Sequence, residues 1–224
     1  MSLPSHHPAD DHLFSYASGR MGEVKAVLVA THLAYCPVCR ARVAAFEAQC
    51  GDWFEELAPS PELLGSLDDM LSKLDAQLDA LERDAPAAAA ADAVRKPPPS
   101  VPVAPPGHPL VPLPLRDWSG FRIDTADWNP LAQGVALSQW SVEKGGSSVC
   151  LLRMGPGAAV PAHRHTAEEL LLVLQGSFSD EYGRYRVGDV ATYAAWSDHH
   201  ATGDPGAGDC ICLFLLDGEL QFLD

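Results

Sequence analysis

A long alanine- and proline-rich segment divides the sequence and limits how the chain can fold. From residue 86 to residue 114 it passes from an alanine run through Lys96-Pro97-Pro98-Pro99 into further prolines. Proline fixes φ and lacks a backbone N–H, so a segment of this composition is extended and adds nothing to a packed core. We therefore predict two folded parts, residues 1–85 and 117–224, joined by a linker over residues 86–116.

The residues before the linker follow a helical pattern. We expect helices near residues 12–18, 22–34 and 37–57, with Asp10 or Asp11 capping the first and Gly19 ending it. Ser60-Pro61-Glu62 predicts the start of a fourth helix. Its apolar residues recur every three or four positions: Leu63, Leu64, Leu67, Met70, Leu71, Leu74, Leu78 and Leu81. Aspartates fill much of its other side, so this helix is predicted to be amphipathic with an acidic outer face.

The second and third of these helices meet at an H-x3-C-x2-C motif formed by His32, Cys36 and Cys39. Pro37 suits the first position of a helix, which places Cys36 at the N-cap and Cys39 one turn later. Two thiolates and an imidazole favour Zn²⁺, and a structural zinc site takes a fourth protein ligand. The alternative is a helix turn with two inert cysteines, but the histidine at this spacing favours a metal site.

After the linker the pattern changes to short strands with alternating side chains. The predicted strands, separated by glycine-containing turns, are 135–142, 148–154, 169–175, 178–182 and 210–216. Many short strands at regular spacing predict an antiparallel β-sandwich or barrel. The whole chain is thus expected to be α+β, with a four-helix N-terminal domain and a C-terminal β domain.

A second group of metal-binding residue types lies in the β half. His163 and His165 are two apart on a strand and so point to the same side. A carboxylate follows at Glu168 or Glu169, and a further histidine at His199 or His200. Three imidazoles and a carboxylate fit Zn, Mn, Fe(II), Ni or Cu, and ligand type does not choose among these metals.

Composition narrows the classes of partner. The net charge of −15 argues against direct binding to nucleic acid or an anionic membrane and suits a basic protein partner. No apolar run is long enough to span a membrane, and no signal peptide is visible, so we expect a cytoplasmic protein. The six cysteines are then thiols or ligands. Cys210 and Cys212, which face one side of a strand, are expected to be small core residues.

The residues from Gly157 to Gly176 match the first cupin motif, G-x5-H-x-H-x3-E-x6-G, at His163, His165 and Glu169. The second cupin motif is partly present: Gly188-Asp189 matches its opening, and His199 follows at the usual distance. The usual proline and glycine before that histidine are replaced by residues 194–198, which leaves His200 as an alternative. An H-x3-C-x2-C helical domain joined to a cupin domain resembles the ChrR family of zinc-binding anti-sigma factors.

This resemblance implies the ligands of two metal sites. The helical domain would hold zinc through His32, Cys36, Cys39 and one N-terminal histidine, for which we prefer His7 over His6, with His12 as a third choice. The cupin domain would hold zinc or another divalent metal through four residues: His163, His165, Glu169 and His199.

The resemblance also implies a function. The helical domain is expected to bind an extracytoplasmic-function sigma factor and hide its polymerase-binding surface. The cupin domain is expected to pass on an oxidative signal such as singlet oxygen or organic peroxide. We accordingly expect no catalysis and no direct contact with nucleic acid or membrane, and we leave the oligomeric state of the free protein open. The alternative is a cupin metalloenzyme, a dioxygenase or isomerase, with an accessory zinc module.

Overall fold

The computed structural model describes residues 3–57, 61–84, 111–119, 126–141 and 148–223. The chain divides into two compact units, one of Met1–Cys50 with Pro109–Asp224 and one of Gly51–His108. The predicted linker falls mostly outside the described residues. Its last residues belong to helix α6 (Leu113–Ser119), in which Leu115 is fully buried.

Four helices form the N-terminal region, as the sequence predicts: α1 (Asp10–Ala17), α2 (Glu23–Tyr35), α3 (Pro37–Glu55) and α4 (Pro61–Asp84). The expected aspartate cap of α1 is wrong, because the N-cap is Ala9, whose side chain makes no capping hydrogen bond. Asp10 and Asp11 lie in the first turn, where their charge still favours the positive end of the helix dipole. Gly19 follows the helix with φ of +69°, a conformation in which glycine has no Cβ penalty.

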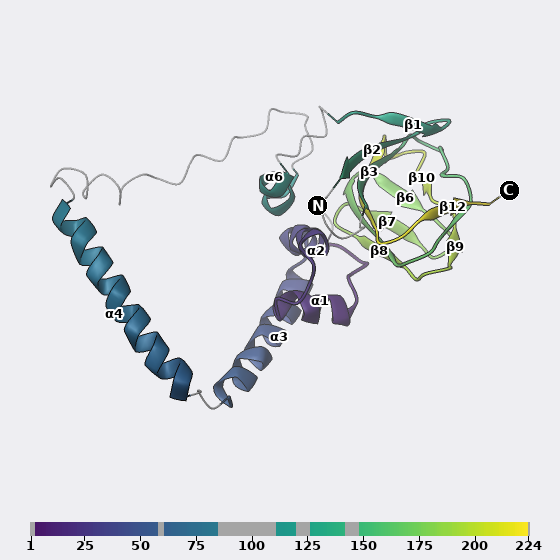
Figure 1. The fold of residues 1–224 in the computed structure, drawn as a ribbon. Coiled ribbons are helices and arrows are strands. Elements are labelled where there is room, and N and C mark those ends of the chain that lie inside the picture. Colours follow the sequence, from purple (N-terminus) through teal and green to yellow (C-terminus); the bar gives the residue numbers. More distant parts are fainter. Residues whose placement is uncertain (1–2, 58–60, 85–110, 120–125, 142–147, 224) are drawn as a thin grey trace. The chain divides into compact units, whose positions relative to one another are not determined.

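The described strands of the barrel (Figure 1) pair antiparallel, which confirms the predicted class. Its strands are β1 (Asn129–Ala132), β2 (Val135–Ser141), β3 (Ser148–Met154), β4 (His163–His165), β5 (Glu169–Gln175), β6 (Ser177–Ser179), β7 (Arg184–Arg186), β8 (Val190–Tyr193), β9 (Asp198–His199), β10 (Thr202–Gly203), β11 (Cys210–Leu216) and β12 (Leu220–Phe222). They form a six-stranded sheet, β1-β2-β3-β11-β5-β8, and two three-stranded sheets, β10-β6-β7 and β12-β4-β9.

The strand predicted over residues 178–182 is shorter than expected. It ends at Ser179 because the Asp180 carboxylate accepts hydrogen bonds from the backbone N–H groups of Tyr182 (2.8 Å) and Gly183 (2.9 Å). Such an aspartate turn competes with continuation of the strand. The chain therefore reverses at this point.

Both faces of the six-stranded sheet are covered. Along β11, Cys210, Cys212 and Phe214 join the core inside the barrel, whereas Leu213 and Leu215 join an outer cluster with Leu28 of α2, Leu115 of α6 and other apolar residues. A strand buried on both faces reads as a continuous apolar run, which explains the sequence of β11. The expected shared orientation of Cys210 and Cys212 is confirmed, with their Sγ atoms 3.7 Å apart.

Two candidate metal sites

The first site lies where α2 ends and α3 begins. The ligand atoms of His7, His32, Cys36 and Cys39 all lie within 4.8 Å of one another. His7 Nδ1 is 3.4 Å from the Sγ atoms of both Cys36 and Cys39. His32 and both cysteines are buried and His7 is half-buried. The structure thus brings together the three motif residues and, of the three N-terminal histidines considered, His7.

The local geometry follows from the sequence of this junction. The Cys36 N–H bonds to the His32 carbonyl (3.0 Å) and ends α2, while the Arg40 N–H bonds to the Cys36 carbonyl (3.2 Å) and begins α3. Pro37 is the first residue of α3, where its missing N–H costs nothing. The Cys36 thiol also accepts the Cys39 N–H (3.4 Å), as an N-cap side chain does. As predicted, Cys36 comes directly before the first residue of α3 and Cys39 lies in its first turn.

His32 is oriented for a metal. Its side chain is fully buried, and its Nδ1–H donates to the carbonyl of Gly188 over 2.7 Å. Its Nε2 is buried without a hydrogen-bond partner among the described residues. Burial lowers the pKa of His32 to about 4, so the imidazole is neutral and offers a lone pair at Nε2. A buried, unpaired nitrogen beside two thiols fits a metal ligand.

The thiol pair supports the same interpretation. Burial, and after it the neighbouring Cys36 thiol, raises the pKa of Cys39 to about 12. A buried thiol with a pKa this high stays protonated unless a cation compensates the charge. A divalent ion deprotonates coordinating thiols outright, so its binding would release the Cys39 proton.

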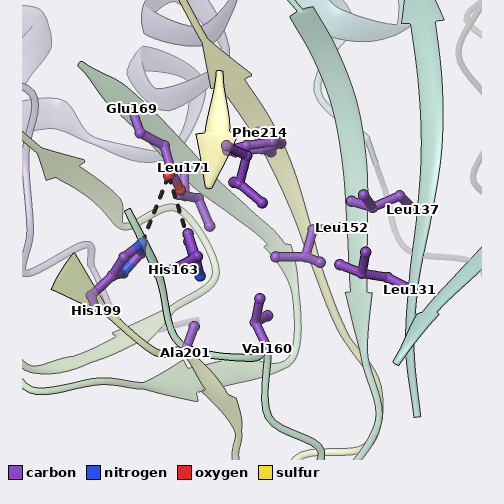
Figure 2. A pocket seen from close by; sticks show the side chains of 11 residues that line it. Leu131, Leu137, Leu152, Val160, His163, Glu169, Leu171, His199, Ala201 and Phe214 are labelled. Carbon is purple, nitrogen blue, oxygen red and sulfur yellow. Dashed lines mark ion pairs between the residues drawn. The ribbon is translucent and has the colours of Figure 1, made fainter. Parts of the chain in front are cut away.

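The second site lies inside the barrel. His163 and His165 come from β4, Glu169 from β5 and His199 from β9, and their ligand atoms also lie within 4.8 Å of one another. All four side chains are buried. Glu169 Oε2 is 2.5 Å from His165 Nε2, 3.7 Å from His199 Nε2 and 4.0 Å from His163 Nε2. Figure 2 shows His163, Glu169 and His199 converging on one point.

The rival residues lie elsewhere. Glu168 pairs with His12 and with Lys25, each over 3.1 Å. His200 is exposed and pairs with Glu181. The structure therefore brings Glu169 and His199 to the site and leaves Glu168 and His200 outside it.

The departure from the second cupin motif is accommodated by one backbone feature. Trp196 adopts φ of +68°, and its N–H donates to the carbonyl of His165 over 2.8 Å. A positive φ at a bulky residue is costly and persists only where the surroundings impose it. This bond ties the segment before His199 to the strand that carries the other histidines.

At the barrel site, the carboxylate of Glu169 and the neighbouring imidazoles stabilise each other's charged forms. Burial would raise the pKa of Glu169, but the imidazoles of His165 and His199 lower it. Burial also lowers the pKa of His199, but the carboxylates of Asp180 and Glu169 outweigh burial and raise it to about 9. A cation held by Glu169 and the three histidines would take over the role of that proton.

Sequence reasoning missed Asp180 as a part of this site. Its Oδ2 accepts the Tyr193 hydroxyl and lies 3.9 Å from His199 Nδ1. The Tyr193 ring lies against the His199 ring, with centroids 3.8 Å apart. Carboxylates behind metal-binding histidines fix the ring orientation and tautomer. In the sequence, Asp180 is only an aspartate in a turn. Such aspartates are too common to mark a residue behind a metal ligand.

A small cavity adjoins the barrel site. It has a volume of about 30 Å³ and borders His163, Glu169 and His199 (Figure 2). Its other walls are largely apolar: Leu131, Leu137, Leu152, Val160, Leu171, Ala201, Phe214 and Leu220. A space of this size admits a molecule about as large as water.

Among the described residues, no helix combines the length and apolar character that crossing a membrane requires.

The fold and the two clusters define a class of protein, a cupin barrel preceded by helices with a His/Cys site. Residues 119–219 match the family described as the ChrR cupin-like domain. The anti-sigma-E factor ChrR of Cereibacter sphaeroides is 37% identical over 218 residues, which cover 97% of this chain and 92% of that protein. The chain belongs to the ChrR family of anti-sigma factors.

A solved structure matches nearly the whole chain. The crystal structure of Rhodobacter sphaeroides SigE in complex with the anti-sigma ChrR matches with a TM-score of 0.69 and 31% identity. The match covers 96% of this chain and 100% of that one. The relative is a regulatory protein by name, which supports the expectation that this chain is not an enzyme.

Proposed function

We propose that this protein is an anti-sigma factor that sequesters an extracytoplasmic-function sigma factor in the cytoplasm. The observation that carries the proposal is the unit Gly51–His108, which has no buried residue in its described parts, 51–57 and 66–81. The relative found in complex with SigE matches nearly the whole chain and supports the same partner class.

The apolar side chains of this unit support a protein partner. Trp53, Phe54 and Leu57 are 50%, 76% and 67% exposed. The apolar stripe of α4 is also exposed, at Leu67, Met70, Leu71, Leu74, Leu78 and Leu81. Apolar side chains gathered in this way mark an interaction surface. An amphipathic helix that buries its stripe in a partner is a common mode of recognition, and the acidic opposite side suits a basic protein.

The first metal site would hold the helical domain, residues 1–85, together. The buried core of its helices is small: Leu13, Val29, Cys36, Cys39 and Val43. Zinc bound by His7, His32, Cys36 and Cys39 would tie the N-terminus to the α2–α3 junction. Small domains commonly need such a metal, because their apolar core alone supplies little stability.

The cupin domain, residues 117–224 after a linker at 86–116, would act in release. We propose that it binds zinc or another divalent metal through His163, His165, Glu169 and His199. An oxidant such as singlet oxygen or an organic peroxide would change this site and lead to release of the sigma factor. The small cavity beside the ligands would limit access to small molecules.

Co-purification tests the anti-sigma proposal. The tagged full-length chain is expressed in its native cells, and bound proteins are identified by mass spectrometry. We expect one sigma factor in equimolar amount, and its loss from a Cys36→Ser/Cys39→Ser variant. A Cys50→Ser variant is the matched control, since Cys50 lies in α3 outside the site. Absence of any sigma factor from the zinc-loaded wild-type chain would contradict the proposal.

A further inference from the structure

The segment before His7 is bound to one turn of the barrel. We call residues 4–7 the N-terminal strap and residues 186–190, between β7 and β8, the barrel turn. The Asp189 Oδ1 atom accepts the backbone N–H groups of Ser5 (2.6 Å) and His6 (3.1 Å). The N–H of Val190 donates back to the His6 carbonyl over 3.2 Å. The barrel turn thus fixes the strap at the residues that come directly before His7.

The surroundings of Asp189 keep its carboxylate in place as the acceptor for the strap. Its side chain is 1% exposed, and its second oxygen accepts the Arg186 N–H of its own turn over 2.8 Å. Burial would raise the pKa of Asp189, but its hydrogen bonds from the turn and the strap lower it. A buried carboxylate that accepts several backbone N–H groups is costly to replace.

The same turn holds a second ligand of the first site. The Gly188 carbonyl accepts the Nδ1–H of His32 over 2.7 Å. Gly188 has φ of +91°, and a Cβ at this position would lie 2.9 Å from both Pro4 Cγ and Tyr35 Cβ. The strap and the end of α2 therefore converge on a residue that has room only for glycine. Two of the four ligands in the first site, His7 and His32, are positioned by the barrel turn.

We propose that the barrel turn is the outer shell of the His/Cys metal site, so that metal affinity in the helical domain depends on its contact with the cupin barrel. By thermodynamic linkage, metal binding strengthens that contact to the same degree. This inference rests on the proposed metal-binding role of the site. Through this coupling, the His/Cys site would connect the helices proposed to bind the sigma factor with the barrel proposed to sense the oxidant.

Strand β8 continues from the barrel turn to the second metal site. It begins at Val190, which bonds to the strap, and ends at Tyr193. Tyr193 pairs with Glu169 in the β5–β8 register and lies against the ring of His199. Four residues of strand span only about 10 Å. A rearrangement at the barrel site thus has a short, continuous path to the first site.

Cobalt binding to the full-length chain tests the proposal. A thiolate-to-cobalt charge-transfer band reports the first site alone, because the barrel site contains no cysteine. The affinity is measured by competition with a chelator for two variants. Asp189→Ala removes the acceptor, and Ser5→Pro removes the N–H and hydroxyl donors of Ser5 and leaves the barrel sequence unchanged. We expect both to weaken binding about 10- to 100-fold.

Matched controls separate this effect from damage to the barrel. Asp204 is also a buried barrel aspartate, but it bonds to Ser177, Ser179 and Arg184 rather than to the helices. Asp204→Ala is expected to leave cobalt affinity at the first site unchanged. Gly188→Ala, which sets a Cβ against Pro4 and Tyr35, is a third barrel-turn variant and is also expected to weaken cobalt binding. Gly208 has φ of +70° with open space around it, so Gly208→Ala is its control and should leave the affinity unchanged.

The outcomes are distinct. Wild-type affinity in Ser5→Pro and in every folded barrel-turn variant, with the charge-transfer band intact, would overturn the inference and leave the proposed metal site standing. Absence of the band from the wild-type chain would overturn both. Equal weakening in Asp204→Ala and Asp189→Ala, with no change in Ser5→Pro, would also overturn it.

Discussion

Truncating two leucines of α4 tests whether its apolar stripe binds the sigma factor. Leu74 and Leu78 are four residues apart, share one side of the helix and are each 49% exposed. Fully burying a leucine contributes about 1.5–3 kcal/mol, so covering the exposed half contributes about 1 kcal/mol per residue. Leu74→Ala/Leu78→Ala should therefore lose about 2 kcal/mol of binding free energy, or about 30-fold in Kd. Alanine keeps the helix propensity high, so the helix itself is retained.

The assay is calorimetric titration of the zinc-loaded chain with the purified sigma factor. Leu113→Ala is the matched control, because Leu113 is a helical leucine with 46% exposure in α6, outside the proposed surface. It should bind with wild-type affinity. Wild-type affinity in the double α4 variant, or an equal loss in Leu113→Ala, would refute the assignment of the binding surface to α4.

Three further predictions follow from the two sites. Elemental analysis should find two metal equivalents in the wild-type chain and in His200→Ala but only one in His199→Ala; equal metal content in the two variants would contradict the assignment. Asp180→Ala should weaken metal binding at the barrel site about 10-fold, measured by chelator competition, because His199 loses its outer-shell carboxylate; unchanged affinity would exclude that role. In the metal-free protein, His32 has a folded pKa of about 4 against 6.5 unfolded, so the unfolded state gains the proton first and stability falls as pH drops from 6.5 to 4. At 1.36 kcal/mol per pKa unit, the free energy of unfolding falls by about 3 kcal/mol. Denaturant unfolding at pH 6.5 and at pH 4 should show this decrease, and the His32→Asn variant should not show it.

Local patterns predicted the parts of the fold that depend on nearby residues. The offsets of His163, His165 and Glu169 follow from strand alternation and a short turn, so the sequence predicted that they line one side of a cavity, although β4 and β5 belong to different sheets. Pro37 fixed the relation of Cys36 to Cys39 through the start of a helix. The α1 cap failed because Ala9 reaches the N-cap conformation without a side-chain bond.

Choices between neighbouring residues needed tertiary contacts. His6, His7 and His12 have the same chemistry, and the structure separates them because Asp189 binds the strap before His7 while Glu168 binds His12. The docking of α2 on the barrel through Leu28 was likewise invisible. Such contacts join residues more than a hundred positions apart, and no local period encodes them.

Run-off transcription shows directly whether this chain sequesters a sigma factor. Core RNA polymerase, the co-purified sigma factor and a promoter that this sigma factor recognises are combined with increasing amounts of the zinc-loaded chain. Transcription should be abolished near one equivalent of the wild-type chain and should persist with the Cys36→Ser/Cys39→Ser variant. Undiminished transcription in the presence of a molar excess of the wild-type chain would contradict the proposed function.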